Sequence, residues 1–190
     1  MSRSFIRSSM GILAVLLLFG GSRQIVRADI DEDSVGSSRE YQTKAAFLFN
    51  FAKFVEWPNH KFTQADSPLI IGVVGSDPFG GLLEEAAQDQ RIDQRIIVVR
   101  HVDSREELRK CHIIFISRSE TARFSSILSD VHSDCVLTVG ESDKFINKGG
   151  MINFIMVGNM VRFEINDGAA RHAGLKISSK LQQIALPASR

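Results

Sequence analysis

The segment with the clearest chemical potential is the glycine-rich run 72–81, which reads Gly-Val-Val-Gly-Ser-Asp-Pro-Phe-Gly-Gly. Between a strand and a helix, the backbone amides of such a loop can bind an anion. A nucleotide-binding loop, however, ends in Gly-Lys-Ser/Thr or keeps the spacing Gly-x-Gly-x-x-Gly, and this run does neither. Asp77 is placed to cap the following helix and to occupy those amides itself. We therefore interpret the run as a structural turn.

Metal-ligating and nucleophilic residues show no pattern that favours catalysis. The histidines are scattered over the chain: His60, His101, His112, His132 and His172. The one close pair is Cys111 with His112, and adjacent residues of a regular strand point to opposite faces, so the two do not chelate one ion. No Gly-x-Ser-x-Gly elbow marks a nucleophile, and the acid pair Glu84-Glu85 falls on an exposed helix face. We expect no catalytic residue, no metal and no cofactor.

These residues are carried by strands that alternate with helices. Continuous apolar runs predict strands at 69–75, 95–99, 111–117 and 135–140. Amphipathic or capped segments predict helices at 41–57, 79–88, 104–110, 120–130 and 169–185. Two further strands, 150–156 and 160–166, are joined by Val157-Gly158-Asn159 into an antiparallel hairpin. The prediction is a single three-layer α/β domain over 41–187, with a mostly parallel sheet, helices on both faces and a C-terminal hairpin.

This topology defines one candidate ligand pocket. Open α/β sheets bind ligands at the carboxyl ends of their strands. Gly75 and Ser76 follow the first of the parallel strands, and Gly140 and Glu141 follow the fourth. These four residues are the candidate pocket for a small molecule.

The two cysteines, Cys111 and Cys135, each open a predicted strand. If these strands are parallel neighbours, both cysteines lie at the same edge of the sheet, about 4.8 Å apart, which a disulfide accepts. Two separate buried thiols are the alternative, because a free cysteine behaves as a small hydrophobe. The sequence leaves both readings open.

The N-terminal segment indicates export. Two arginines precede a short apolar run, 11–19, and Val26-Arg27-Ala28 follows as a cleavage site. This layout is typical of a secretory signal, whereas a membrane span needs roughly 20 residues. We expect 1–28 to be a signal peptide cleaved after Ala28, the alternative being an uncleaved anchor, and 29–40 to be a flexible leader. Removal of 1–28, with four arginines and no acid, takes the net charge from +1 to −3, which disfavours nucleic acid as a partner.

Hydrophobic side chains are in surplus at the two ends of the predicted domain. They are Phe47, Phe49, Phe51, Phe54 and Trp57 near the start and Phe154, Met156, Met160 and Phe163 in the hairpin. Exposed patches of such residues mark interfaces more often than active sites. About half of them must instead pack together as core.

Several motifs of the chain resemble those of the YfiR-like periplasmic proteins. The opening motif over 41–58 is Tyr-Gln-Thr-Lys-Ala-Ala-Phe-Leu-Phe-Asn-Phe-Ala-Lys-Phe-Val-Glu-Trp-Pro, and the closing motif over 173–181 is Ala-Gly-Leu-Lys-Ile-Ser-Ser-Lys-Leu. Between them lie Gly-Ser-Asp-Pro-Phe-Gly at 75–80, Cys-His-Ile-Ile-Phe-Ile at 111–116, Val-Leu-Thr-Val-Gly at 136–140, Gly-Gly-Met-Ile-Asn-Phe at 149–154 and Val-Arg-Phe-Glu-Ile-Asn at 161–166. The resemblance covers nearly all of 41–186 in order.

The resemblance implies a regulator and not an enzyme. Well-known members repress a membrane-bound diguanylate cyclase by binding its periplasmic sensor region, which lowers cyclic-di-GMP and biofilm formation. Their dimers and disulfides make repression sensitive to redox state, although they have two disulfides where this chain has only two cysteines. The partner surface implied here lies around Phe154, Glu164, Ala169 and Arg171.

Two functions of different classes follow for the exported protein. The leading one is a periplasmic binding protein that holds a membrane diguanylate cyclase, or a similar sensor protein, inactive, and that forms a homodimer as family members do. The alternative is a small-molecule sensor that uses the pocket at 75–76 and 140–141, without a cyclase partner. An enzyme has no support beyond analogy of fold, which is weak.

Overall fold

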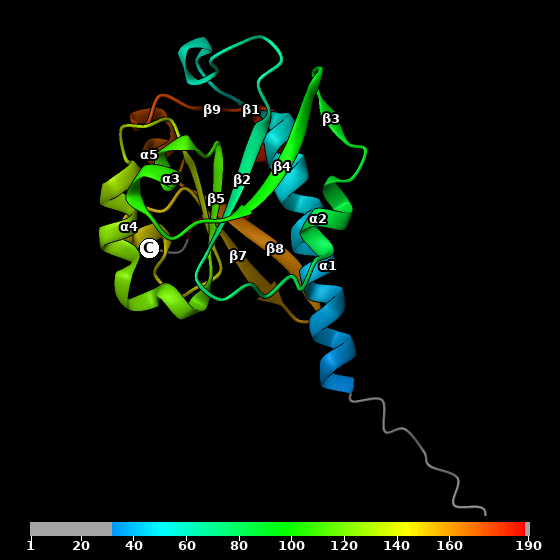
Figure 1. Cartoon of the computed structure of the whole chain (residues 1–190). Coiled ribbons are helices and arrows are strands. Elements are labelled where there is room, and N and C mark those ends of the chain that lie inside the picture. The colour runs from blue at the N-terminus through cyan, green and yellow to red at the C-terminus, as the bar shows by residue number, and fades with distance from the viewer. Residues whose placement is uncertain (1–31, 189–190) are drawn as a thin grey trace, which may run out of the picture. The chain divides into compact units, whose positions relative to one another are not determined.

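A seven-stranded sheet forms the middle layer of the protein, whose computed structural model describes residues 32–188 (Figure 1). The strand order is β3-β4-β2-β5-β6-β7-β8. The parallel inner strands are β4 (Arg95–His101), β2 (Leu69–Val74), β5 (Ile113–Ile116), β6 (Leu137–Gly140) and β7 (Ile152–Val157). Antiparallel strands close the two edges: β3 (Arg91–Ile92) and β8 (Met160–Ile165). The mostly parallel sheet with a C-terminal hairpin is confirmed, and β3 is an additional antiparallel strand that the sequence did not predict.

Helices cover both faces of this sheet, as predicted. One face carries the larger hydrophobic cluster, to which α1 (Glu32–Phe54), α2 (Leu82–Ala87), α5 (Asp167–His172) and α6 (Ser179–Ile184) contribute. The other face carries a second cluster with α3 (Arg105–Lys110) and α4 (Phe124–Val131). Short 3-10 turns connect these elements: η1 (Asn59–Lys61), η2 (Arg118–Arg123) and η3 (Ile146–Lys148). A capping box of Ser104 and Glu107, a local pattern of the sequence, starts α3.

Helix α1 packs so closely against the sheet that Phe49 and Phe51 become core and Phe47 is partly buried. Phe51 is 0% exposed, and its ring centroid lies 5.1 Å from that of Phe163 and 5.7 Å from that of Phe154. Phe47 stacks beside Phe51 and also reaches both hairpin rings. Full burial of one such side chain stabilises the fold by roughly 2–3 kcal/mol. Of the surplus hydrophobic residues seen in the sequence, Phe49, Phe51, Phe154 and Phe163 are thus buried, whereas Phe54, Met156 and Met160 are exposed.

The first helix starts earlier and ends earlier than the sequence predicted. It begins at Glu32, so most of the leader expected over 29–40 is helical, and the side chains of 36–39 on this extension are exposed. A helix already held by packing adds one hydrogen bond for each further residue, so polar residues can prolong it into solvent. At its other end α1 stops at Phe54, because β1 (Val55–Glu56) pairs with β9 (Lys176–Ile177).

The prediction of one helix over 169–185 is wrong. The segment forms two short helices, α5 and α6, with β9 between them. Gly174 adopts a positive φ of 80°, and the Leu175 N–H donates to the Ala170 carbonyl at 2.9 Å. A glycine in the left-handed conformation with such a bond ends a helix. The chain can then pair with β1 before α6 starts.

None of the helices within residues 32–188 combines the length and the apolar character that a membrane crossing requires. The signal peptide expected over 1–28 lies outside the described residues.

His112, just before β5, is a buried titratable group that contacts Ile70 of β2 and Phe62, which follows η1. The residue is only 4% exposed; its Nδ1 accepts the Ile70 N–H at 3.1 Å, and its ring stacks on Phe62 with centroids 4.5 Å apart. Burial, and then the positive charges of Lys61 and Arg95, lower the pKa of His112 to about 4. The ring therefore stays neutral at pH values where an unfolded histidine becomes charged.

We predict that His112 makes the fold less stable as the pH falls from about 6.5 to about 4, and has no further effect below that range. In this window the unfolded chain binds a proton that the folded chain excludes, which costs up to roughly 3 kcal/mol. Urea unfolding at a series of pH values measures the slope. His112→Asn retains an acceptor for Ile70 but cannot titrate, so its slope should be flatter. The exposed His172→Asn is the control and should keep the wild-type slope; equal slopes for both variants would contradict the prediction.

Candidate functional site

The four residues of the predicted pocket lie at the carboxyl ends of two strands that are not neighbours. Gly75 and Ser76 follow β2, whereas Gly140 and Glu141 end and follow β6, and β5 lies between these strands. Ser119 fills the space above the first pair: its Oγ accepts the Ser76 N–H at 3.0 Å, and a Cβ added to Gly75 would lie 2.4 Å from it. The small-molecule alternative at these four residues stays a prediction.

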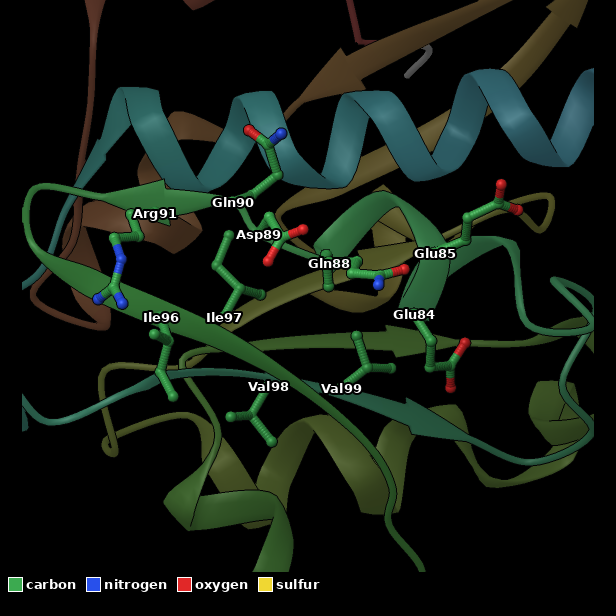
Figure 2. A pocket seen from close by; sticks show the side chains of 11 residues that line it. Glu84, Glu85, Gln88, Asp89, Gln90, Arg91, Ile96, Ile97, Val98 and Val99 are labelled. Carbon is green, nitrogen blue, oxygen red and sulfur yellow. The ribbon is translucent and has the colours of Figure 1, made fainter.

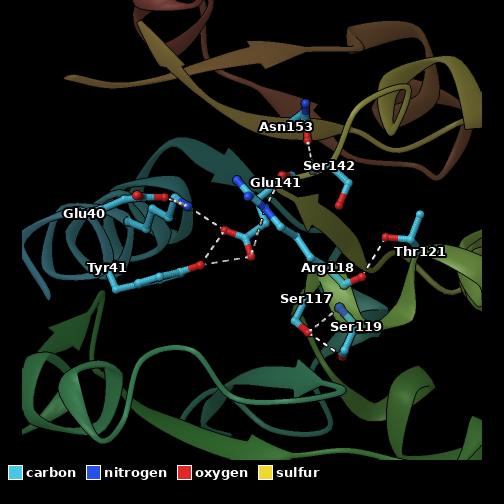
Figure 3. Close-up of polar contacts among 10 residues, drawn as sticks. Glu40, Tyr41, Ser117, Arg118, Ser119, Thr121, Glu141, Ser142 and Asn153 are labelled. Carbon is cyan, nitrogen blue, oxygen red and sulfur yellow. Dashed lines mark hydrogen bonds and ion pairs between the residues drawn. The ribbon is translucent and has the colours of Figure 1, made fainter. Parts of the chain in front are cut away.

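Glu141 instead belongs to a buried ion pair with α1. The Lys44 Nζ lies 2.5 Å from Glu141 Oε2, and the two residues are only 1% and 5% exposed. Tyr41 donates its hydroxyl proton to the same carboxylate at 3.2 Å. Glu40 also pairs with Lys44, and Arg118 donates from Nε to the Glu141 carbonyl at 3.2 Å. Figure 3 shows Tyr41 of α1 and Arg118 of η2 reaching Glu141 from different elements, with Glu40 beside them.

Charges in this cluster are balanced within the chain, with two carboxylates facing two cations. Burial and then the negative charge of Glu141 raise the pKa of Tyr41 well above its ordinary value, so its phenol remains a proton donor. Each polar group is thus satisfied by a neighbour of the same protein, as buried charges require. We call Glu40, Tyr41, Lys44, Arg118 and Glu141 the latch, because together they fix α1 to the end of β6.

The latch was not predicted from the sequence, although Tyr41 and Lys44 lie in the opening motif. Glu141 was named only as a candidate pocket residue. One signal was present: Lys44 falls on the apolar face of a strongly hydrophobic helix, one residue before the buried Ala45. A lysine in such a position needs a partner, but a sequence does not say which carboxylate supplies it.

We predict that Lys44→Met destabilises the protein by about 3–5 kcal/mol, because it leaves the Glu141 carboxylate buried without its main cation. The double variant Lys44→Met/Glu141→Leu should be more stable than the single one, since no unpaired charge remains. Urea unfolding of the single and double variants measures this coupling.

The matched control for this prediction is Lys53→Met, which removes an exposed cation of the same helix. Substitutions at such surface positions usually change stability by no more than about 0.5 kcal/mol. Equal effects of Lys44→Met and Lys53→Met would show that the latch is not a stabilising element.

The two cysteines lie on opposite faces of the sheet, and both are free. Cys111 packs in the cluster under α3 and α4, with its Sγ 3.3 Å from the Glu107 carbonyl. Cys135 packs on the α1 side, 3.7 Å from His60 Nε2. β5 and β6 begin two residues later than predicted, so Cys111 is the C-cap of α3 and does not follow the strand alternation. The disulfide that the sequence left open is therefore not formed in this structure.

We predict two titratable thiols per chain after denaturation without reductant, measured with Ellman's reagent. In the folded protein both should react slowly, because each is buried, and burial raises the pKa of the Cys111 thiol to about 11. Recovery of fewer than two thiols from unreduced protein would demonstrate a disulfide and contradict the structure.

Two of the four predicted partner-binding residues are buried and two are not. Phe154 and Glu164 are 2% and 4% exposed, so neither presents its side chain to a partner. Phe154 is held in the core by the phenylalanines of α1, and Glu164 pairs with Asn153 across the hairpin and bridges to Leu186. Ala169 is half-buried, and Arg171 is exposed beside Asp167, with which it forms an ion pair. The expectation of a surface role for Phe154 and Glu164 is corrected accordingly.

The hairpin instead exposes the apolar residues at its turn. We call Met156, Val157 and Met160 the hairpin tip; they are 41%, 45% and 61% exposed. Gly158, with φ of 57°, occupies the first position of a two-residue turn, and Val157 pairs directly with Met160. The tip lies beyond Phe154 and Phe163, whose rings contact Phe47 of α1.

A groove of about 860 Å³ separates the tip from the N-terminal half of α1. Its lining combines apolar and basic side chains: Gly36, Ser37, Arg39, Glu40, Thr43 and Phe47 from α1, and Met156, Asn159, Met160, Val161 and Arg162 from the hairpin. Glu40 is neutralised by Lys44, so Arg39 and Arg162 leave the groove positively charged. Among the described residues, no group of three or more His, Cys, Asp or Glu is arranged to hold a metal ion.

These features together define a three-layer α/β domain, with a buried ion-pair cluster between α1 and β6 and an apolar hairpin tip exposed. Residues 41–186 match the family model described as YfiR/HmsC-like (DUF4154), and the chain belongs to that family.

Comparison of structures shows the same fold elsewhere. The crystal structure of a conserved domain protein from Vibrio cholerae O1 biovar El Tor is similar with a TM-score of 0.53 at 11% sequence identity. The similarity covers 78% of this chain and 60% of that one. A comparison with curated proteins finds no match to the chain.

Proposed function

We propose that this protein is exported to the periplasm by a cleaved signal peptide and represses a membrane diguanylate cyclase by binding its periplasmic sensor region. Membership of the YfiR/HmsC-like family supports the class of function. The observation that carries the specific proposal is the hairpin tip, where three apolar side chains are exposed around one turn. Such patches mark binding sites in soluble domains.

The proposed interface runs along the outer strand β8, from the hairpin tip to α5. Met160 begins β8, Arg162 follows within it, and Arg171 lies on α5 just after it. A strand of this length extends over about 20 Å. That span suits a standard interface, which buries about 800 Å² of each partner. The apolar tip would supply the desolvated centre, and Arg162, Ala169 and Arg171 the polar rim.

Repression needs the domain to bind one conformation of the sensor region better than the other. A ligand shifts a two-state equilibrium only by its difference in affinity for the two states. We infer that the protein prefers the inactive arrangement of the sensor region and thereby lowers cyclic-di-GMP synthesis. The homodimer implied by the family resemblance stays a prediction.

To test this function, the chain is exported in a host with membrane diguanylate cyclases, and cyclic-di-GMP and co-purified membrane proteins are measured. We expect a lower cyclic-di-GMP concentration and recovery of a cyclase that has a periplasmic domain. Met160→Glu should reduce recovery at least tenfold, because a charge at the centre of an interface must be desolvated on binding.

The control Gln183→Glu adds the same charge at an exposed site on α6 and should bind like the wild type, as should the conservative Met160→Leu. Circular dichroism would establish that all variants fold. Unchanged cyclic-di-GMP on export would overturn the proposed function, whereas normal recovery with Met160→Glu would overturn only the assignment of the interface.

A further inference from the structure

The two edges of the sheet differ in how much of each is covered by other segments of the chain. At the β8 edge the C-terminal segment returns, so that the Leu186 N–H donates to the Phe163 carbonyl at 2.9 Å and Leu186 bridges to Glu164. At the other edge β3 has only two residues and pairs with Arg95 and Ile96 alone. Beyond Ile96, the described residues place no strand against the outer side of β4. An open strand edge of this kind is a template for pairing with another chain.

The direction of the backbone groups of β4 follows from its bonds to β2. The Val102 N–H donates to the Val73 carbonyl at 3.0 Å, so Val102 directs its backbone groups toward β2. Successive residues of a strand alternate in this respect. Ile97, Val99 and His101 therefore direct their N–H and C=O groups outward, away from the sheet.

A groove of about 560 Å³ runs between this edge and α2, and its residues surround it in Figure 2. Its floor is the apolar stretch 96–99 of β4. Its wall carries the carboxylates of Glu84, Glu85 and Asp89, and none of the three forms a salt bridge with another described residue. The one basic residue of the lining, Arg91, directs its guanidinium to the Gln94 carbonyl at 3.2 Å. The groove is thus apolar along the strand and acidic along the helix.

We propose that the open edge of β4 is a docking site for an extended segment of another protein, which adds a strand to the sheet and carries basic side chains in alternation with apolar ones. The outward backbone groups supply its hydrogen bonds, as in other cases of strand addition. Basic side chains on one face of the segment meet Glu84, Glu85 and Asp89, and apolar side chains cover the edge of β4. The unpaired stretch of β4, 97–101, sets the length of the segment that can pair with it.

The acidic wall also argues against a second copy of this chain as the occupant. If two β4 edges paired antiparallel around a two-fold axis, both α2 helices would lie on the same side of the joined sheet. Their unpaired carboxylates would then face one another, and like charges at an interface oppose association. The site lies at the opposite edge of the sheet from the hairpin tip, so it does not depend on the proposed cyclase interface.

The probe for this site is a capped peptide, Val-Lys-Val-Arg-Val-Lys-Val, added to the full chain. We expect saturable binding by fluorescence anisotropy, and hydrogen exchange at least tenfold slower at the amides of Ile97, Val99 and His101. The peptide Val-Glu-Val-Glu-Val-Glu-Val has the same strand propensity with opposite charge and should bind at least tenfold more weakly. Protection of those amides without peptide, rising with protein concentration, would identify a second copy as the occupant and overturn the proposal.

Two kinds of variant test separately the acidic side chains of the groove wall and the outward backbone groups of β4. Glu84→Lys/Glu85→Lys changes only side chains of the wall and should weaken binding of the basic peptide at least tenfold, and strengthen binding of the acidic one. Val99→Pro removes an outward N–H and should weaken both, whereas Val99→Thr retains the N–H and should bind like the wild type. Basic-peptide binding that neither the charge reversal nor Val99→Pro alters would overturn the proposal, and the charge reversal decides the outcome if Val99→Pro does not fold.

Discussion

The attachment of α1 to the sheet is the constraint on which the rest of the structure depends. The helix is held at two kinds of contact: the stacking of Phe47 and Phe51 on the hairpin rings, and the buried pair of Lys44 with Glu141. The first contact is non-directional and supplies free energy through burial. The second is directional, since a desolvated lysine is tolerated only where its carboxylate lies. Together they place α1 in one position along β6, β7 and β8.

This placement decides which hydrophobic residues are left for function. Because α1 covers the base of the hairpin and not its turn, Phe154 and Phe163 are core, while Met156 and Met160 are exposed. The N-terminal part of the same helix continues past the sheet and forms one wall of the groove beside the tip. A helix that began at Lys44 would leave the hairpin without most of that wall. The proposed binding surface is therefore a consequence of how α1 closes the core.

The two edges of the sheet offer a partner two different kinds of surface. The chain covers the β8 edge with its own C-terminal residues, so that partners there would meet side chains of the tip and of α5. The β4 edge is covered only at its first two residues, so that a partner there would meet backbone groups. Side-chain surfaces favour selectivity through shape, and backbone pairing favours extended segments of many sequences. One small domain can thereby present two unlike surfaces.

The sequence by itself determined the buried parallel strands, most of the helices, the hairpin and their order, whereas β1, β3 and β9 were not predicted. The apolar runs of β2 and β5, the capping box at Ser104 and the hairpin around Gly158 are local patterns, set by residues a few positions apart, and each is present in the structure. The tertiary structure alone decided the pairing of Lys44 with Glu141, 97 residues away, the burial of Phe154 and Glu164, and the opposite faces of the two cysteines. These features depend on which elements meet and at what register, and periodicity within one segment carries no information about its neighbour in space.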